Sequence, residues 1–287
     1  MSSSRLEKPH PRQRRLAAGR RANVTPDLPL YREPELYDIA FGFRDVPQEC
    51  DGILALARKH GVAQPESLLE LACGPAHHLR ELASRGLRGV GVDINPLMLH
   101  YARRLCRRDD VVVEFEQADM RTFALRQRVE MALCLFDSFA LCVSDRDAII
   151  TLQRVHAALK RRGLFLIEFS HPADFFGSGR SRTMDHWTER NRQLSVKTEF
   201  RFSRFDAVAE TFVADLKLQA TDRKSGKRGR RVAMRWLQRM WFRSAVEYVT
   251  LASGCFDLVG WYGDLDPGVA LTSGAKAWRM VAVLRRR

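Results

Sequence analysis

Two acidic residues at the ends of neighbouring apolar segments are the side chains best spaced for joint chemistry. Glu70 lies two residues before a turn of small residues, 72–76, and Asp93 ends the next apolar segment, 19 residues after Gly74. Small residues let the backbone pass close to a ligand, and the spacing leaves room for one helix between two strands. The pattern therefore predicts the first β-α-β unit of a nucleotide-binding site, with both acids at one crevice.

The turn residues indicate which charge the ligand carries. A dinucleotide fingerprint would place glycine at positions 72, 74 and 77, where this chain has Ala72, Gly74 and His77. Glu70 would also repel a pyrophosphate, which prefers a helix N-terminus. A nicotinamide-dependent oxidoreductase is therefore disfavoured, and Glu70 favours a cationic group on the ligand.

The elements that must position these acids alternate along the first part of the chain. Apolar and amphipathic patterns predict helices at 34–40, 48–60, 77–85, 96–107 and 145–161 and strands at 67–71, 88–92, 111–116, 130–136 and 164–170. This alternation implies parallel strand pairing with right-handed crossovers.

After residue 185 the pattern changes to alternating polar and apolar residues. Residues from about 186 to 243 are predicted to form an antiparallel β insertion, followed by a helix at 244–253 and strands at 255–262 and 276–285. An insertion at this point in such a fold typically covers the mouth of the main crevice, so we expect it to select the second substrate.

Composition limits the classes of protein that the chain can represent. The chain has 287 residues and a net charge of +14, but residues 1–25, 223–231 and 285–287 carry +6, +6 and +3, which leaves −1 for the rest. We expect residues 1–29 to be a disordered basic leader and 30–287 to be one domain. Without a long apolar stretch or a Cys-x-x-Cys pair, a cytoplasmic protein with reduced thiols and no metal is expected.

Four motifs in order resemble those of the class I S-adenosylmethionine-dependent methyltransferases. The segment 70–76 resembles motif I, 117–120 (QADM) the acidic motif of strand three, 133–139 (LCLFDSF) motif IV, and 159–165 (LKRRGLF) a Leu-Lys-Pro-Gly-Gly turn. The β insertion and the Tyr37 helix resemble the small-molecule type. The resemblance implies a doubly wound, Rossmann-like, seven-stranded, mostly parallel sheet and S-adenosyl-L-methionine as the cofactor.

The resemblance also implies roles for individual side chains. Glu70 is expected to hold the α-amino group, Asp93 the two ribose hydroxyls and Asp119 the adenine amino group. The full set expected to bind cofactor is Glu70, Ala72, Gly74, Asp93, Ile94, Met98, Asp119, Met120 and Phe136. Alanines replace the outer two glycines of motif I, and we expect both alanines to have negative φ.

Acceptor chemistry is assigned to polar side chains near the crevice mouth. His171, which follows the strand 164–170, is the first candidate for an orienting group or base. Tyr37, Asp137 and His186 are further candidates for this role. The adjacent histidines at 77 and 78 are interpreted as helix-capping or surface residues rather than metal ligands. The aromatic residues considered for the pocket wall are Phe139, Phe175, Phe176, Trp187, Trp261 and Tyr262.

The sequence thus predicts methyl transfer to an oxygen or nitrogen atom of a small-molecule acceptor. An RNA-directed methyltransferase is the first alternative, because the ends and one turn are basic. It is less favoured, because position 136–139 (FDSF) has neither the Asp/Asn-Pro-Pro-aromatic signature nor a Pro-Cys nucleophile. A non-catalytic module that keeps the fold is the second alternative. No membrane partner is expected, and the acceptor and the oligomeric state stay open.

Overall fold

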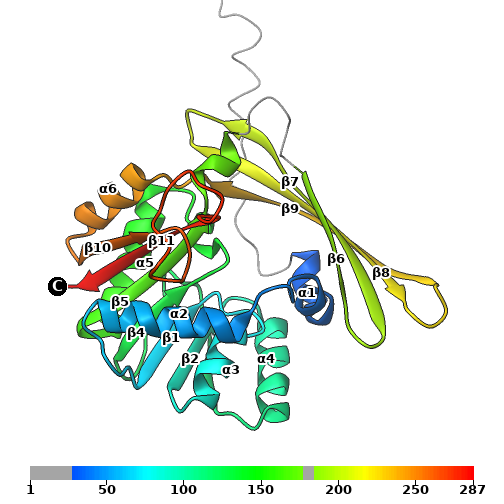
Figure 1. Ribbon diagram of the computed structural model, residues 1–287, viewed down its shortest axis with the longest axis horizontal. Helices are drawn as coiled ribbons and strands as arrows, with labels where there is room; N and C mark the ends of the chain where they lie inside the picture. Colours follow the sequence, from blue (N-terminus) through cyan, green and yellow to red (C-terminus); the bar gives the residue numbers. More distant parts are fainter. Residues whose placement is uncertain (1–27, 177–183) are drawn as a thin grey trace, which may run out of the picture.

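The chain folds into one mostly parallel sheet and one antiparallel sheet, which face each other with α1 between them. The computed structural model describes residues 28–176 and 184–287 (Figure 1). The first sheet has seven strands in the order β10-β11-β5-β4-β1-β2-β3. Its strands are β1 (Ser67–Leu71), β2 (Arg88–Asp93), β3 (Val113–Gln117), β4 (Val129–Cys134), β5 (Leu159–Ser170), β10 (Phe256–Tyr262) and β11 (Arg279–Arg286). β1 to β5 pair in parallel, and β11 pairs antiparallel with β5 and β10, which confirms the predicted fold class.

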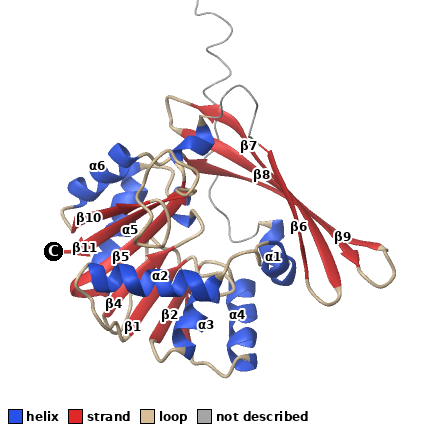
Figure 2. Cartoon of the chain, viewed as in Figure 1, coloured by secondary structure: helices blue, strands red, loops and turns tan. Residues whose placement is uncertain are grey.

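Helices cover both faces of this sheet (Figure 2). They are α2 (Val46–Lys59), α3 (His77–Ser84), α4 (Pro96–Arg108), α5 (Asp145–Ala158) and α6 (Arg243–Ser253), whereas α1 (Pro34–Ala40) packs on the second sheet. One core joins α5 and α6 to the sheet, and a second core joins α2, α3 and α4 to the opposite face. Asn95 and Ser144 accept backbone N–H bonds at the starts of α4 and α5, which fixes where these helices begin.

The second sheet is the predicted insertion and has the order β6-β7-β8-β9. Its strands are β6 (Met184–Arg190), β7 (Leu194–Asp206), β8 (Thr211–Asp222) and β9 (Arg228–Arg239), all antiparallel. Apolar residues of one face pack on α1, where Leu36 and Ile39 contact the cluster that contains Val196 and Leu216. The insertion is therefore held to the main domain through α1.

The predicted boundary between the helix 145–161 and the strand 164–170 is wrong by three residues at the helix end and by five at the strand start, and its cause is local. The helix predicted at 145–161 ends at Ala158, and Leu159 starts β5 by pairing with Val129. A leucine at position 159 is expected to be buried both at the end of a helix and at the start of a strand. Its helical spacing therefore could not distinguish the two elements. Arg162 has a φ of 62°, which is a left-handed conformation. It stands where the motif that 159–165 resembles has the first glycine of its Leu-Lys-Pro-Gly-Gly turn. The strand predicted at 130–136 also ends earlier, at Cys134.

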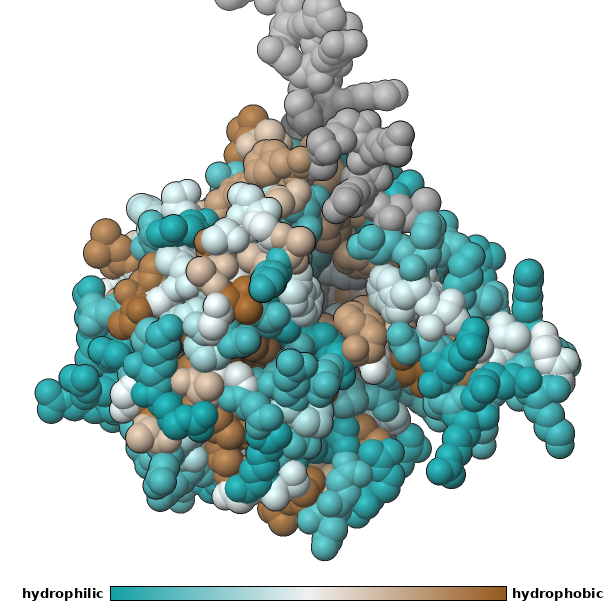
Figure 3. All heavy atoms as spheres, in the orientation of Figure 1, coloured by the Kyte–Doolittle hydropathy of each residue, from teal (hydrophilic) through white to brown (hydrophobic). Residues whose placement is uncertain are grey.

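The basic segments lie mostly away from the two cores. Residues 223–231 are exposed around the turn between β8 and β9, and hydrophilic side chains cover this end of the insertion (Figure 3). Of the predicted leader, 1–29, residues 1–27 lie outside the described residues, and Pro29 begins the short helix η2 (Pro29–Arg32). Across the described ranges, no helix is long and apolar enough to cross a membrane. All six cysteines are unpaired, and five of them are buried.

Candidate functional site

Parallel pairing of β1 and β2 brings Glu70 and Asp93 to the same edge of the sheet. Glu70 lies beside Gly91 in the register, and the Cys73 amide after the strand donates to Val92 O at 3.2 Å. A Cβ on Gly91 would lie 2.8 Å from Cys73 Sγ, so only glycine lets the turn pack against β2. The spacing argument from the sequence is thus reproduced by the fold, with α3 as the crossover helix.

The turn uses left-handed backbone at three alternate positions. Ala72, Gly74 and Ala76 have φ of 50°, 49° and 58°. The expectation of negative φ at the two alanines is therefore wrong, because the turn keeps the shape that glycine would adopt more easily. Each left-handed alanine costs about 1–2 kcal/mol relative to right-handed backbone, and the strain is held by the buried strands on either side.

Asp93 is a buried carboxylate with spare hydrogen-bonding capacity. Oδ2 accepts from Gly74 N at 2.9 Å and Oδ1 accepts from Asn95 N at 2.8 Å, and the side chain is 9% exposed. Burial raises its pKa, while the two amides oppose the shift. Each oxygen can accept a further bond, which suits a ligand with two adjacent hydroxyl groups.

Glu70 provides the strongest test of whether the site fits a cationic ligand. It is 5% exposed, and within the described part of the chain its Oε2 finds no hydrogen-bond donor. Burial raises the pKa of Glu70 to about 8, and the nearby Asp93 carboxylate acts in the same direction. A buried carboxyl oxygen without a donor is costly, so the α-ammonium of S-adenosylmethionine fits what this side chain lacks.

The side chains expected around the adenine are arranged differently from the prediction. Asp119 accepts from Arg121 through both oxygens, Oδ1 from Nε at 2.9 Å and Oδ2 from Nη2 at 2.6 Å. Arg121 thus shares this carboxylate, and because Oδ2 can accept a second bond, the expected role of Asp119 toward the adenine amino group stays a prediction. Met98 is buried in α4, Met120 packs against the α5 core, and Ile94 is half-buried after β2.

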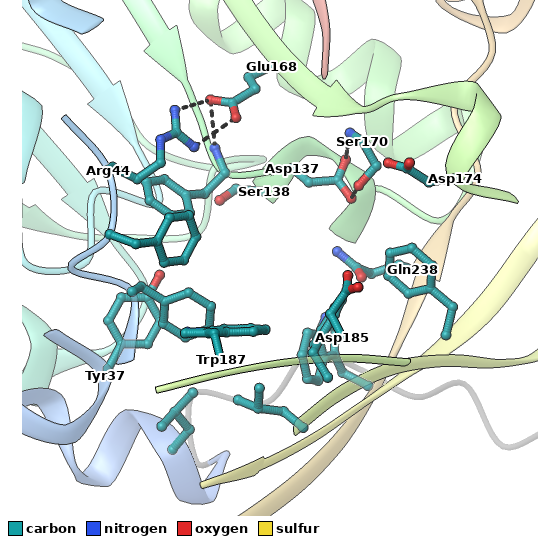
Figure 4. Close-up of a pocket in the computed structure, with 18 of the residues that line it drawn as sticks. Tyr37, Arg44, Asp137, Ser138, Glu168, Ser170, Asp174, Asp185, Trp187 and Gln238 are labelled. Carbon is teal, nitrogen blue, oxygen red and sulfur yellow. Dashed lines mark hydrogen bonds and ion pairs between the residues drawn. The ribbon is translucent and has the colours of Figure 1, made fainter. Parts of the chain in front are cut away.

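A cavity of about 650 Å³ separates the parallel sheet from the insertion. Figure 4 shows polar groups from β4, β5 and the insertion facing one another across it, with aromatic rings from the α1 side. Residues that line it include Tyr37, Phe41, Arg44, Phe136, Asp137, Ser138, Glu168, Ser170, Asp174, Asp185, His186, Trp187, Gln238 and Trp278. Tyr37, Asp137 and His186 thus lie where the sequence analysis expected acceptor chemistry. Of the predicted aromatic wall, Trp187 lines the cavity, whereas Phe139 lies in the main core.

Asp137 presents a carboxyl group to this cavity and is held there by Ser170. Oδ1 accepts from Ser170 N at 3.1 Å, and Oδ2 accepts from Ser170 Oγ at 2.9 Å. Burial raises the pKa of Asp137 to about 7, despite the opposing bonds from Ser170. Phe136 and Asp137 have φ of 54° and 55°, so the backbone after β4 is strained where it presents the carboxylate.

His171 is placed by the structure outside the lining of this cavity. Its Nδ1 accepts from Ala173 N at 3.1 Å at the start of the short helix η4 (Pro172–Phe175), and its Nε2 lies 3.0 Å from Thr272 O. Because Nδ1 accepts, Nε2 carries the proton and donates to the carbonyl. Both ring nitrogens are therefore engaged, and the predicted role of His171 as a base is not supported.

A buried network of charged residues beside the cavity was missed in the sequence. Arg44 pairs with Glu168 through two nitrogens, at 2.8 and 3.0 Å, and with Glu49 at 2.5 Å. Its guanidinium lies 4.2 Å from the centre of the Phe136 ring. Arg279 on β11 also pairs with Glu49, at 2.9 Å. The signal was present, because Glu168 and Arg279 are charged residues inside otherwise apolar strands, where they need partners.

His78 belongs to the same network, and its expected place at a helix cap or on the surface is wrong. It is 2% exposed, and its Nε2 lies 2.8 Å from Glu49 Oε2. His77, its neighbour, is about a quarter exposed and pairs with Asp38. The two adjacent histidines therefore face different environments, as neighbouring helical residues must.

Comparison with known sequences agrees with this architecture. Residues 68–163 match a family described as a methyltransferase domain. A dTDP-3-amino-3,6-dideoxy-alpha-D-glucopyranose N,N-dimethyltransferase of Streptomyces fradiae is 32% identical over 136 residues, 47% of this chain and 51% of the relative. A glycine/sarcosine N-methyltransferase of Parasynechococcus marenigrum is 30% identical over 122 residues, 42% of each. The matched part of the chain thus spans about half the length of these relatives.

Solved structures resemble the chain over most of its length. Streptomyces venezuelae DesVI superposes with a TM-score of 0.71 at 19% identity, over 88% of this chain and 97% of DesVI. CalS10 of Micromonospora echinaspora, an amino pentose methyltransferase with bound S-adenosylmethionine, has a TM-score of 0.68 at 20% identity over the same shares. At this identity the likeness establishes the fold, which includes the insertion. The chain thus contains a match to a methyltransferase domain at residues 68–163, and its fold is that of S-adenosylmethionine-dependent methyltransferases.

Proposed function

We propose that this protein transfers a methyl group from S-adenosylmethionine to an amine nitrogen of a small molecule held in the cavity under the insertion. The observation that carries this proposal is the Asp137 carboxyl. It lines the cavity and has its pKa raised to about 7, so it can exchange a proton at neutral pH. Donor and acceptor would then occupy two adjoining parts of the same sheet edge.

The donor side consists of groups that bind and orient. Glu70 would pair with the α-ammonium, Asp93 would accept from the ribose hydroxyls, and the tight turn at Gly74 would bring the backbone close to the ligand. When bound, the cofactor supplies a methyl group on a sulfonium, which a nucleophile displaces in line. The chain contributes alignment and exclusion of water, which are the main requirements of such a displacement.

The acceptor side is suited to a cationic amine. Asp137, Asp174 and Asp185 contribute carboxylates to the lining, and the two arginines of the lining are paired with Glu49 and Glu168. Trp187 and Phe41 add aromatic surface, with ring centres 5.8 Å apart. An ammonium would be attracted by the carboxylates and would give its proton to Asp137, which leaves the nitrogen lone pair free to attack.

The relatives support an amine acceptor without defining it. Both sequence relatives are named as N-methyltransferases, one for an amino sugar nucleotide and the other for glycine or sarcosine. The amine class is common to both names, whereas the sugar and the amino acid are not. We therefore propose an amine as the group that is methylated. The rest of the acceptor molecule is to be identified by experiment.

The proposal is tested by the pH dependence of an Asp137→Asn variant. If Asp137 is the base, wild-type kcat/KM rises with pH through about 7, and the variant loses roughly 10²–10⁴-fold in kcat and loses this rise. Cofactor affinity, measured by calorimetry with S-adenosylhomocysteine, should stay unchanged. Ser170→Ala, which keeps the carboxylate but removes one donor to it, serves as the matched control with a smaller loss. A variant with wild-type kcat and pH profile would contradict the proposal.

A further inference from the structure

His78 is a deeply buried titratable side chain to which the proposed function gives no task. It lies in the first turn of α3, directly after the turn that would receive the cofactor. Its ring stands edge-on to Phe136, with centres 6.4 Å apart, and Cys50 Sγ approaches its carbonyl oxygen. Water therefore has little access to either ring nitrogen.

The imidazole lies between two carboxyl groups from different elements. Nε2 is 2.8 Å from Glu49 Oε2 on α2, and Nδ1 is 3.8 Å from Glu70 Oε1 on β1. Glu49 is also bound by Arg44 and Arg279. Although burial raises its pKa, the hydrogen bond with His78 and the two arginines lower it to about 2, so Glu49 is ionised. An ionised Glu49 fixes the tautomer, because Nε2 must carry the proton and Nδ1 keeps its lone pair toward Glu70.

The charges around this pair favour neutral forms before the ligand binds. Burial lowers the pKa of His78, and Arg44 adds to this effect, whereas Glu49 and Glu168 oppose it. Burial raises the pKa of Glu70 to about 8. At neutral pH the proton therefore resides mainly on Glu70, and Nδ1 of His78 is unprotonated.

Binding of an ammonium group changes what Glu70 must do. A charge-assisted pair needs the ionised carboxylate, so the proton has to leave Glu70. The carboxyl is only 5% exposed, and His78 Nδ1 faces its Oε1 at 3.8 Å, whereas the nearby Asp93 carboxylate already accepts from two backbone amides. The alternative, release of the proton to bulk water, would require a path through the packed turn.

We propose that His78 Nδ1 takes the proton of Glu70 when the ammonium of the cofactor binds, which makes His78 a positioning residue of the cofactor site. The O–H bond of Glu70 breaks and an N–H bond forms at Nδ1, as the 3.8 Å gap closes to hydrogen-bond distance. The imidazolium then lies between the Glu49 and Glu70 carboxylates, and no proton leaves the protein. This inference rests on the proposed function, since it concerns the same cofactor site.

Calorimetry with S-adenosylhomocysteine in buffers of different ionisation enthalpy counts the protons released on binding. At pH 7.5 wild-type protein should release close to none. His78→Gln keeps a donor for Glu49 but has no base facing Glu70, so release should rise toward one proton and affinity should fall about tenfold, the effect of one pKa unit. Glu70→Gln should bind weakly and release none.

His77→Gln is the matched control, because His77 lies on the same helical turn but pairs with Asp38 instead. It should leave both the proton count and the affinity at wild-type values. A His78→Gln protein that binds with wild-type affinity and wild-type proton count would overturn the inference.

Nitrogen NMR of the wild-type protein gives a second readout that does not depend on how the variants fold. His78 should change from the neutral Nε2–H tautomer to the imidazolium when S-adenosylhomocysteine saturates the protein at constant pH. A neutral His78 in the saturated protein would contradict the inference, even if binding is tight. A wild-type protein that does not bind S-adenosylhomocysteine would overturn the proposed function itself.

Discussion

The edge of the parallel sheet and the inner face of the insertion form the two sides of one site by different means. At the sheet edge, Glu70 and Asp93 are buried and fixed by a turn with strained backbone. On the insertion side, Asp185 is exposed, and Trp187 is half-buried and held through its Nε1 donating to Ala40 O at 2.5 Å. The side that we propose to bind the cofactor is therefore preorganised, whereas the side that we propose to bind the acceptor depends on how the insertion packs on α1.

This difference explains where variation can be tolerated. The turn must keep its left-handed backbone, because it follows β1, packs against β2 and donates a hydrogen bond to the Asp93 carboxylate. The insertion can change its inner side chains without disturbing the parallel sheet, since its own apolar cluster packs on α1. We expect substitutions at the sheet edge to change cofactor binding and substitutions on the insertion to change acceptor binding.

The largest expected effect concerns Asp93. Asp93→Ala removes a carboxylate that would accept two ligand hydrogen bonds, each worth about 1.5–3 kcal/mol when charge-assisted. Affinity for S-adenosylhomocysteine should fall about 100-fold or more in calorimetry. Asp93→Asn, which keeps the shape but not the charge, should lose less. Wild-type affinity in Asp93→Ala would remove this residue from the cofactor site.

The pH dependence of stability should reveal the buried Glu70 carboxyl. Its pKa is near 8 in the folded protein, against an ordinary value of 4.5, so between these pH values the folded state holds a proton that the unfolded state has lost. The free energy of unfolding should therefore fall as pH rises through this window, by up to about 1.4 kcal/mol per pH unit, and level off above pH 8.

Glu70→Gln should remove that slope and should be more stable than the wild type at pH 8 without ligand. Denaturant unfolding at several pH values, with the wild type and variant compared at each, measures the difference. A variant with the same slope as the wild type would show that Glu70 is ionised in the folded, ligand-free protein.

A smaller effect is expected on the insertion side. Trp187→Ala removes an aromatic ring that lines the cavity, so KM for an amine acceptor should rise about tenfold, in line with the energy of a buried aromatic contact. Trp187→Phe, which retains a ring, should lose less. Cofactor affinity should be unchanged in both variants, and a drop in it would show that the two sides are not separable.

The smallest expected effect concerns the turn itself. Ala76→Gly relieves left-handed strain at φ 58° but adds freedom to the unfolded chain, and the balance should stabilise the protein by about 1 kcal/mol or less. Thermal unfolding should show a slightly higher Tm with unchanged cofactor affinity. Destabilisation would mean that the Ala76 methyl group contributes packing that outweighs its strain.

The sequence predicted the donor side better than the acceptor side for a physical reason. Glu70, the turn and Asp93 are close in sequence, and strand periodicity fixes their relative places. Arg44, Glu168 and Arg279 meet only through long-range contacts between the segment before α2, β5 and β11, and no local spacing encodes that meeting. His171 follows a strand end, as a functional residue often does, yet its ring caps η4 and binds Thr272 O.

Asp119 shows that a side-chain contact can be missed even between residues that are close in sequence. Its place after β3 was predicted correctly, but Arg121 two residues later takes both of its oxygens. The left-handed alanines were missed because φ is set by the packing of β1 against β2, which residue size alone does not reveal. Strand and helix identities depend on periodicity, and there the predicted and observed boundaries agree within about three residues, except that β5 begins five residues before the predicted strand 164–170.

The most direct test of the account is methyl transfer from labelled S-adenosylmethionine to paired acceptors. Each pair should contain an amine, such as an amino sugar nucleotide or glycine, and its hydroxyl analogue, with total RNA as a separate acceptor. The account predicts label in at least one amine, at least about tenfold above its hydroxyl analogue and above RNA. Label that appears only in RNA or only in hydroxyl acceptors would contradict it.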